Sequence, residues 1–406
     1  MRIQLQNQDG TPTLGITLLL ASLSMISPLS IDTFLPSFPT IAREFGLSSL
    51  EVQQIITAYL LPFACFSLVH GPLSDALGRR QVVIGGLVLY TIGSIGCFVA
   101  PTFGTLLACR VLQGMAAGIG PTVARAVVRD AFDGHNAQRL MSSMMLVFSI
   151  APAVAPIIGG WVHVALGWRS VFGMLVVLGA ALVVLTSLLM PETHPPEKRT
   201  PVHPAALARS CLRVASQPAF LLLAFSAALA FASIFIYIGS SPAIILEQWH
   251  LTETQFYYLF VPIVGGLMTA SFAGGRLAGR VSRPQILKVG FLLLCISALL
   301  GALGHFVTDD VPRLMTQVLW FTMAVGAQLT YPILSLEMID MFPQARGAAA
   351  SVQSFIALGV GAVVIGLIAP LLHGDLGYLS MVSLFWSLVA WITWRAGVSL
   401  RHRSGL

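Results

Sequence analysis

At residues 71–80 the sequence reads Gly71-Pro72-Leu73-Ser74-Asp75-Ala76-Leu77-Gly78-Arg79-Arg80, and this stretch lies between two long apolar runs. The glycines Gly71 and Gly78 permit a sharp reversal of the chain. Asp75 can accept hydrogen bonds from helix ends or pair with a base. We expect Arg79 and Arg80 to anchor the reversal at a membrane surface. The stretch therefore predicts a tight charged turn that works as a moving joint.

The composition around this stretch is that of a membrane protein. Charged residues make up 9% of the 406 positions and hydrophobic residues 56%, with a mean hydropathy of +0.85, whereas a soluble domain has roughly 25% charged residues. A helix needs about 20 apolar residues to cross a bilayer. We therefore expect an all-α integral membrane protein with twelve transmembrane helices. The candidate spans are 14–35, 52–71, 81–100, 103–125, 138–162, 170–190, 218–240, 255–274, 285–305, 312–336, 347–371 and 377–395.

The basic residues predict the orientation. The first apolar run is longer than the core of a signal peptide and lacks a small-residue cleavage site, so we expect it to stay in the membrane. Nearly all of the 22 Lys and Arg residues, Arg2 included, fall on one side of the predicted spans; the exceptions are Arg43, Arg169, Arg313 and the intramembrane Arg110. The positive-inside rule then places both termini in the cytoplasm. The net charge of +6 follows from this asymmetry, and we expect no nucleic-acid partner.

A polar, proline-rich interval after the sixth span divides the chain. It predicts an N-terminal six-helix bundle at 1–190, a cytoplasmic linker at 191–217 and a C-terminal six-helix bundle at 218–406. Gly275-Arg276-Leu277-Ala278-Gly279-Arg280, after the eighth span, is a weak echo of the first stretch. This favours two pseudo-symmetric halves with a substrate path between them near the midplane, although any cytoplasmic loop can collect Gly and Arg. The five cysteines indicate neither a disulfide nor a metal site, and we expect no cofactor.

Residues 71–80 resemble, as G-x-L-S-D-x-x-G-R-R, the signature between the second and third helices of the major facilitator superfamily. Ala76 departs from the pattern, since a basic residue often stands there. The resemblance implies that Asp75 engages the cytoplasmic ends of neighbouring helices when that side is shut. Its implied partners include Arg129 and the start of the eleventh span near Gly347.

Three further stretches resemble the bicyclomycin-resistance (Bcr/CflA) branch of drug:proton antiporters. They are Asp32-Thr33-Phe34-Leu35-Pro36, Arg125-Ala126-Val127-Val128-Arg129-Asp130 and Ala151-Pro152-Ala153-Val154-Ala155-Pro156-Ile157-Ile158-Gly159-Gly160. The resemblance implies a carrier of the bacterial inner membrane that works as a monomer. Such a carrier exports small amphipathic or hydrophobic molecules in exchange for protons, by alternating access.

In the fifth span, Pro152 and Pro156 are four residues apart and share a helix face, and Gly159 and Gly160 follow on the next turn. Prolines free backbone carbonyls and glycines admit a neighbouring helix, so the segment suits bending or tight sealing. By resemblance it is the antiporter signature, with Ala155 in place of the usual Gly. A kink that serves packing alone is the alternative.

Two charged residues lie inside predicted spans, where an ionisable group is costly and normally turns toward a cavity or a partner. With 1.5 Å per residue, Asp32 lies about 5 Å and Arg110 about 10 Å below the outer boundary, so the two side chains could meet. Arg110-Val111-Leu112-Gln113-Gly114 resembles the fourth-helix motif of the family, whose arginine faces the central cavity and is tied to proton transfer. The alternatives are a snorkelling Arg110 and an interfacial Asp32.

These residues suggest how protons and substrate exclude one another. Burial favours the neutral form of a carboxyl group and a nearby guanidinium favours the charged form, so a substrate that displaces water or disturbs Arg110 would change the protonation of Asp32. With Gln113 beside them, Asp32 and Arg110 are the candidates for proton coupling. Phe235 and Tyr237 of the seventh span are candidates to line an apolar cavity. His70 suits a solvated position at the membrane boundary.

Other function classes fit less well. An intramembrane enzyme would need paired catalytic groups, and the chain has no H-E-x-x-H and no G-x-S-x-G motif. A channel would need a selectivity filter, which nothing in the sequence resembles. A facilitator or a proton symporter for a metabolite, such as a nucleoside or an amino acid, remains the alternative to export. The substrate, the proton stoichiometry and the resting conformation do not follow from the sequence.

Overall fold

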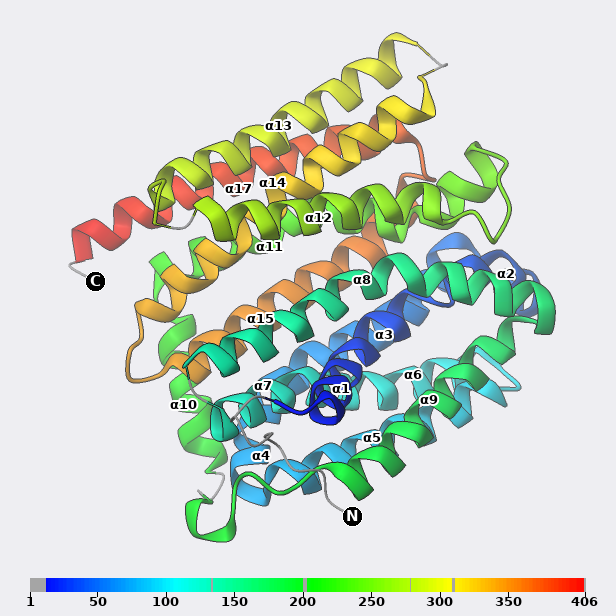
Figure 1. The fold of residues 1–406 in the computed structure, drawn as a ribbon. Coiled ribbons are helices and arrows are strands. Elements are labelled where there is room, and N and C mark those ends of the chain that lie inside the picture. The colour runs from blue at the N-terminus through cyan, green and yellow to red at the C-terminus, as the bar shows by residue number, and fades with distance from the viewer. Residues whose placement is uncertain (1–11, 133, 200–202, 278, 309–310, 405–406) are drawn as a thin grey trace. The chain divides into compact units, whose positions relative to one another are not determined.

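The computed structural model describes residues 12–132, 134–199, 203–277, 279–308 and 311–404, and these residues form helices joined by short connections (Figure 1). Eleven helices are long and apolar enough to cross a membrane, and the number rises to twelve if the bent pair Ser49–Ser67 and His70–Leu77 forms one span. The prediction of an all-α membrane protein with twelve spans is confirmed. Arg2 lies outside the described residues.

The chain divides into two compact units. Unit 1 comprises Met1–Gly46 and Ala58–Pro204, and unit 2 comprises Leu47–Thr57 and Ala205–Leu406. Helix α3 (Ser49–Ser67) contributes to both. Its first residues belong to unit 2, where the side-chain amides of Gln53 and Gln54 donate hydrogen bonds to backbone carbonyls of that unit, at 2.7 and 2.8 Å.

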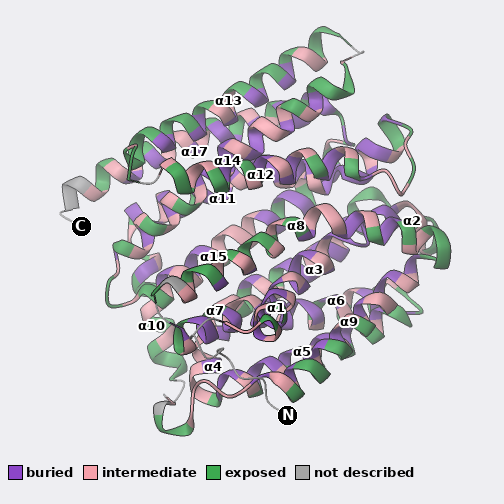
Figure 2. Ribbon diagram, in the orientation of Figure 1, coloured by how far each residue is buried: buried purple, intermediate pink, exposed green. Residues whose placement is uncertain are grey.

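In unit 1, α1 packs against α7 and α8, and α5 packs against α6, α7 and α9. Figure 2 shows that α1 is buried over much of its length. The helices of this unit besides α3 are α1 (Leu14–Asp32), α2 (Phe38–Phe45), α4 (His70–Leu77), α5 (Arg79–Phe98), α6 (Phe103–Ala117), α7 (Ile119–Ala131), α8 (Gly134–Leu166) and α9 (Trp168–Leu189).

Unit 2 is centred on α11, which packs against α14, α15 and α17, while α13 packs against α14 and α17. π-Helical segments at Ala243–Gln248 and Val364–Ile368 interrupt the α-helical geometry. The helices are α10 (Pro204–Ala215), α11 (Pro218–Gly239), α12 (Tyr257–Leu277), α13 (Arg283–Val307), α14 (Arg313–Asp340), α15 (Arg346–Val363), α16 (Ala369–Leu371) and α17 (Leu376–Ser404).

The stretch at residues 71–80 is not the tight turn that we expected. Gly71 lies inside helix α4, and α5 begins at Arg79, so Gly78 alone connects two helices. Gly78 has φ +97°, in the region that favours glycine. The reversal therefore needs one glycine and not two, and the acidic residue of the stretch lies on a helix.

The first span is longer than predicted. A 3₁₀ turn at Leu35–Ser37 follows α1, and the chain then continues in α2, so the apolar span covers Leu14–Phe45. Pro36 fits this short turn because proline is tolerated at the first positions of a helix. Phe45 lies thirteen residues beyond Asp32, about 20 Å along a helix axis. The candidate span therefore continues beyond the predicted end at residue 35.

Three glycines let the helices of unit 1 approach at the backbone. A Cβ atom on Gly114 of α6 would lie 2.2 Å from the Tyr59 carbonyl oxygen, and one on Gly120 of α7 would lie 2.3 Å from that of Leu23. A Cβ atom on Gly159 of α8 would lie only 1.7 Å from the Thr33 carbonyl oxygen. Contacts this short leave no room for any side chain.

Gly159→Ala is therefore expected to destabilise the protein strongly. The added methyl group would have to push α8 away from the end of α1, and overpacking of this kind costs about 3 kcal/mol. Thermal unfolding of the purified protein in detergent measures the effect. Gly85→Ala in α5 is the matched control, because a Cβ atom there meets nothing within 4 Å. Equal melting temperatures for the two variants would contradict the close approach of α8 and α1.

Candidate functional site

Arg110 lies at the centre of a polar core inside unit 1. Its side chain is fully buried, and its guanidinium stands 4.6 Å from the ring centre of Phe34 and 4.4 Å from that of Tyr59. One nitrogen, Nη1, donates to the Ser30 carbonyl oxygen at 3.1 Å and to Gln113 Oε1 at 2.8 Å. The alternative in which Arg110 snorkels to the surface is wrong.

Polar side chains of α1, α5 and α6 complete this core. Gln113 donates through Nε2 to the Ser94 hydroxyl at 2.7 Å. The hydroxyls of Ser30 and Tyr90 are hydrogen-bonded to each other at 2.5 Å. All four side chains are buried. We define the Arg110 core as Phe34, Ser30, Tyr59, Tyr90, Ser94, Arg110 and Gln113.

Sequence reasoning found Arg110 and Gln113 but missed the hydroxyl groups of this core. A signal existed, since Ser30, Tyr90 and Ser94 are polar residues within apolar runs. Such residues are also common in helix packing within membranes. The sequence could not say which of the many serines in the spans contact the arginine.

Asp32 ends α1 two residues after Ser30, and 5% of its surface is exposed. The described residues form no ion pair between Asp32 and Arg110, contrary to our expectation that the two side chains could meet. Arg110 contacts the backbone carbonyl of Ser30 and the ring of Phe34, and side chains two residues apart point to different faces, so the side of the chain that meets Arg110 is not the side that carries the Asp32 carboxyl group. Within the part of the chain that the structure describes, the Asp32 carboxyl group also has no hydrogen bond.

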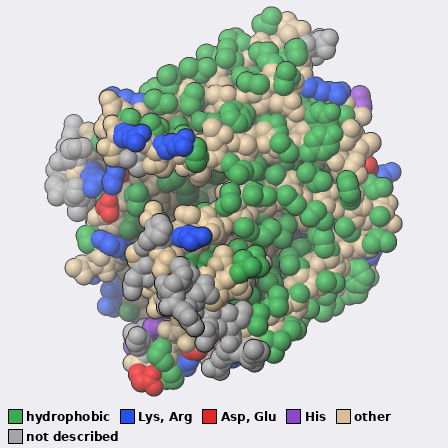
Figure 3. Space-filling model, viewed as in Figure 1, with side chains coloured by type: hydrophobic (Ala, Val, Ile, Leu, Met, Phe, Trp, Pro, Cys, Tyr) green, Lys and Arg blue, Asp and Glu red, His purple; other side chains and the backbone are tan. Residues whose placement is uncertain are grey.

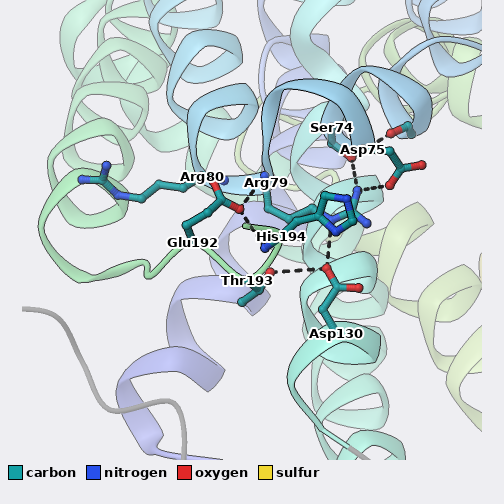
Figure 4. A network of polar contacts seen from close by, with 9 residues as sticks. Ser74, Asp75, Arg79, Arg80, Asp130, Glu192, Thr193 and His194 are labelled. Atoms are coloured by element: carbon teal, nitrogen blue, oxygen red, sulfur yellow. Dashed lines mark hydrogen bonds and ion pairs between the residues drawn. The ribbon is translucent and has the colours of Figure 1, made fainter. Parts of the chain in front are cut away.

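A second polar site joins α4, α5 and α7 around Arg79 (Figure 4). Its guanidinium pairs with Asp75 at 2.5 Å and with Asp130 at 3.0 Å, and it donates to the Ser74 hydroxyl. Asp130 Oδ2 also accepts a hydrogen bond from Thr193 at 3.4 Å. Arg79 is 6% exposed. The expectation that it anchors a turn at the membrane surface is wrong, because two carboxylates hold it inside.

Glu192 closes this second site from the segment after α9. Its carboxylate accepts hydrogen bonds from the backbone N–H groups of Arg79 at 2.9 Å and Arg80 at 3.2 Å, at the start of α5 (Figure 4). An acid at a helix N-terminus satisfies N–H groups that lack a partner within the helix. A Cβ atom on Gly78 would lie 2.6 Å from this carboxylate. We call Ser74, Asp75, Arg79, Asp130 and Glu192 the Arg79 cluster.

Two expectations for this cluster need correction. We expected Asp75 to contact Arg129. Asp75 instead pairs with Arg79, four residues later in the sequence, and the described residues show no pair between Asp75 and Arg129. Arg129 is exposed on α7, and its neighbour Asp130 makes the contact instead. Arg80 donates to the Ser187 carbonyl oxygen of α9.

His70 is buried and lies 2.9 Å from the Met115 carbonyl oxygen, so it is not the solvated residue that we expected.

The proline and glycine residues of the fifth span lie in one continuous helix, α8. Pro156, Gly159 and Gly160 are buried, and Pro152 is half-buried. Because Gly159 contacts the backbone after α1, this part of the helix carries the tight packing that the sequence suggested.

The two aromatic candidates of α11 have different surroundings. Tyr237 is buried, its hydroxyl lies 3.0 Å from that of Ser380 on α17, and its ring is 5.6 Å from that of Trp320 on α14. Phe235 is half-buried and its ring is 6.1 Å from that of Phe231. Tyr237 therefore packs within unit 2, whereas Phe235 retains exposed ring surface.

The comparison with protein families decides the classification. The model of the Major Facilitator Superfamily matches residues 20–366, most of the chain. This chain belongs to the major facilitator superfamily. It is accordingly a multi-pass membrane transporter, and the expected membership of that superfamily is confirmed.

The chain aligns with most of the length of several relatives in the superfamily. The chain is 29% identical over 328 residues to the uncharacterized MFS-type transporter YdgK of Bacillus subtilis, covering 80% of this chain and 82% of the relative. It is 27% identical over 363 residues to a bicyclomycin resistance protein homolog of Haemophilus influenzae, covering 88% of each. It is 28% identical over 277 residues to the multidrug resistance protein MdtL of Escherichia coli, covering 68% and 70%.

Solved structures support the same fold. The chain is similar to the D-xylose-proton symporter, with a TM-score of 0.74 and 14% identity over 94% of this chain and 97% of the other. It is also similar to the human organic anion transporter MFSD10, with a TM-score of 0.69 and 19% identity over 94% and 99%. At these identities the likeness shows the superfamily fold alone.

Proposed function

We propose that this transporter exports small amphipathic or hydrophobic molecules across the bacterial inner membrane in exchange for protons, by alternating access. The observation that carries the proposal is Asp32, a buried carboxyl group in the first span with no hydrogen bond or ion pair to the described protein. The printed names of two relatives, a bicyclomycin resistance protein homolog and a multidrug resistance protein, support export of drug-like molecules.

Asp32 suits the role of the proton carrier because a charged carboxylate is expensive inside a membrane. In the proposed cycle, Asp32 takes up a proton from the outside and releases it to the cytoplasm, and substrate that enters the carrier promotes this release by displacing water or disturbing Arg110. Each proton that enters contributes about 2.3 kcal/mol per 100 mV of membrane potential, which drives roughly a fifty-fold gradient of a neutral substrate.

The Arg110 core would link this event to the helices. Arg110 contacts the backbone of α1 at Ser30, so a shift of α1 when Asp32 changes charge would alter contacts of the buried guanidinium. Gln113 fixes the guanidinium from the same helix at 2.8 Å. We assign to Asp32 the binding and release of the proton. We assign to Arg110 and Gln113 the coupling of that event to helix movement.

Aromatic rings in unit 2 offer a surface for an apolar substrate. Phe231 and Phe235 of α11 and Tyr331 of α14 are half-buried, and the rings of Phe231 and Tyr331 are 4.9 Å apart. Ring faces of this kind bind flat apolar groups by offset or edge contacts. We propose that Phe235 contacts the substrate, and we withdraw that role from Tyr237.

The Arg79 cluster would act in the conformational cycle and not in binding. It ties α4, α5, α7 and the segment after α9 together through one buried guanidinium and three carboxylates. Closing and opening of the cytoplasmic side would require these contacts to form and break together. Gly71, Gly78, Arg80, Pro152, Pro156, Gly159 and Gly160 would support the same movement as packing and hinge residues.

Arg79→Gln is expected to lower the melting temperature by about 5 °C and transport at least about tenfold. The change leaves Asp75 and Asp130 without their cation, and an uncompensated pair costs about 1–3 kcal/mol where it is partly exposed. The measurements are thermal unfolding and drug efflux from cells at matched expression.

Arg129→Gln is the matched control for this variant, because Arg129 is an exposed arginine of α7 next to Asp130. It should leave both quantities unchanged. If Arg129→Gln reduces transport as much as Arg79→Gln, then Arg129 is the partner of the signature acid and the role of Arg79 is wrong.

The placement in the cell completes the proposal. We propose two six-helix bundles at 1–190 and 218–406, a cytoplasmic linker at 191–217, both termini in the cytoplasm and a functional monomer. Nearly all basic residues lie on one side of the spans, which supports this orientation.

Transport in proteoliposomes with an imposed pH gradient tests the function. Bicyclomycin and other antibiotics, nucleosides and amino acids are each offered on the cytoplasmic side. We expect accumulation of a drug-like compound against its gradient only when the opposite side is acidic. Accumulation of a nucleoside or an amino acid in the direction of proton flow would instead identify a metabolite symporter.

A further inference from the structure

Helix α17 carries an apolar groove that belongs to neither polar site. The groove has a volume of about 550 Å³ and is lined by Leu388, Trp391, Ile392, Arg395 and Ala396. Each of these residues has another of the set three or four positions away, so they share one face of the helix.

This face of α17 points away from its own bundle. Leu388 and Ile392 are 45% and 66% exposed, whereas Ala390 and Trp394 on the other side of the helix are buried. Trp391 forms a flat wall of the groove, since its indole stacks on Phe291 of α13 with 16° between the ring planes. In a membrane-spanning helix, an exposed apolar face of this kind contacts lipid chains.

At one end of the groove lies the basic side chain of Arg395, at the boundary of the hydrocarbon layer. No Asp, Glu, Lys or Arg occurs from Leu376 to Trp394, and this stretch is about 27 Å long, close to the thickness of the hydrocarbon. Arg395 follows directly and is exposed. Its guanidinium therefore lies at the level of the lipid headgroups, while Leu388 and Ile392 lie deeper.

The acidic residues near this end of α17, Asp340 and Glu337, interact with bases other than Arg395. Asp340 pairs with Arg283 at 3.6 Å, and Glu337 lies within the electrostatic reach of Arg283 and Arg401. Arg395 forms no ion pair with a described acid. Lys288 of α13 is also exposed. Figure 3 shows Lys and Arg side chains gathered where α13 begins and α17 ends. The surplus of positive charge favours an anion beside the groove.

We propose that this groove binds one anionic phospholipid, with its phosphate on Arg395 and an acyl chain along Leu388 and Ile392. The ligand must join a negative headgroup to a long apolar chain, because the groove joins an unpaired base to an apolar face at matching depths. A zwitterionic lipid fits less well, since its amine would lie among bases. This site does not depend on the proposed direction of transport.

Fluorescence quenching by brominated lipids tests the proposal, because bromine on the acyl chain quenches a tryptophan that it touches. The full chain and its Trp391→Phe variant are reconstituted in phosphatidylcholine vesicles that contain phosphatidylglycerol. Either lipid is brominated in turn, at equal mole fraction. The difference between the two proteins gives the quenching of Trp391 alone.

We expect phosphatidylglycerol to occupy the groove about fivefold more readily than phosphatidylcholine, the effect of one base near an anionic surface. Arg395→Gln should reduce this preference to about one, and Arg209→Gln, which removes an exposed base of α10, should leave it unchanged. Equal quenching by the two lipids in the unaltered protein would overturn the proposal. So would a preference that survives Arg395→Gln, or a Trp391 that neither lipid quenches.

Discussion

Arg110→Lys is expected to reduce transport at least about a hundredfold although the positive charge is kept. The planar guanidinium stands between the rings of Phe34 and Tyr59 and reaches Ser30 and Gln113 from one nitrogen. An ammonium group cannot stack in this way or reproduce the fork of donors. Each lost bond to a charged donor costs about 1.5–3 kcal/mol, which is a factor of ten to a hundred in a conformational equilibrium. Efflux from cells at matched protein level measures the loss.

Arg169→Lys is the control for this experiment. Arg169 also stacks on an aromatic ring, that of Trp168, and pairs with Glu44, but it is partly exposed. We expect it to tolerate lysine with less than about a threefold change. Wild-type transport by Arg110→Lys would show that the Arg110 core serves only to hold the helices together through charge and volume.

Asp32→Asn is expected to abolish uphill transport while substrate still moves down its own gradient. Asparagine has nearly the same volume as aspartate, so the packing around α1 should survive, but it does not exchange a proton. Everted vesicles energised by a pH gradient should accumulate no drug through the variant. Counterflow of labelled for unlabelled drug should continue at about the wild-type rate.

Two further variants sharpen this prediction. Asp32→Glu keeps a titratable group and should retain part of the accumulation. Glu247→Gln removes an exposed acid of unit 2 and should change nothing. Full accumulation by Asp32→Asn would assign proton coupling to another group, and loss of counterflow as well would give Asp32 a role in substrate binding.

The sequence predicted the class of fold because the signal is spread over many residues. Twelve apolar runs of bilayer length can be recognised without knowing which helices contact one another. The reversal at residue 78 was also predictable, since only glycine adopts φ +97° at low cost. Helix α4 was missed because Gly71 suggested the start of a turn, yet Gly71 and Pro72 lie in the first turn of α4, where proline is tolerated.

The candidate site was predictable only in part. Arg110 and Asp32 were identified because each is a charge inside an apolar run. The orientation of their side chains relative to each other was not predicted, because residues two apart, such as Ser30 and Asp32, point to different faces of α1. Glu192 was missed altogether: it meets Arg79 from 113 positions away, and nothing local marks it as the cap of α5. Tyr237 and Phe235 differ in burial because their faces of α11 meet different neighbours.

The proton flux driven by a substrate gradient tests the central claim most directly. Proteoliposomes that report internal pH are loaded with no pH gradient, and a transported drug is then allowed to flow out down its own gradient. Antiport predicts that the interior becomes acidic as the drug leaves, and that Asp32→Asn removes this change. An interior that becomes alkaline, or drug efflux with no change of internal pH, would contradict the proposal that this protein is a proton-coupled exporter.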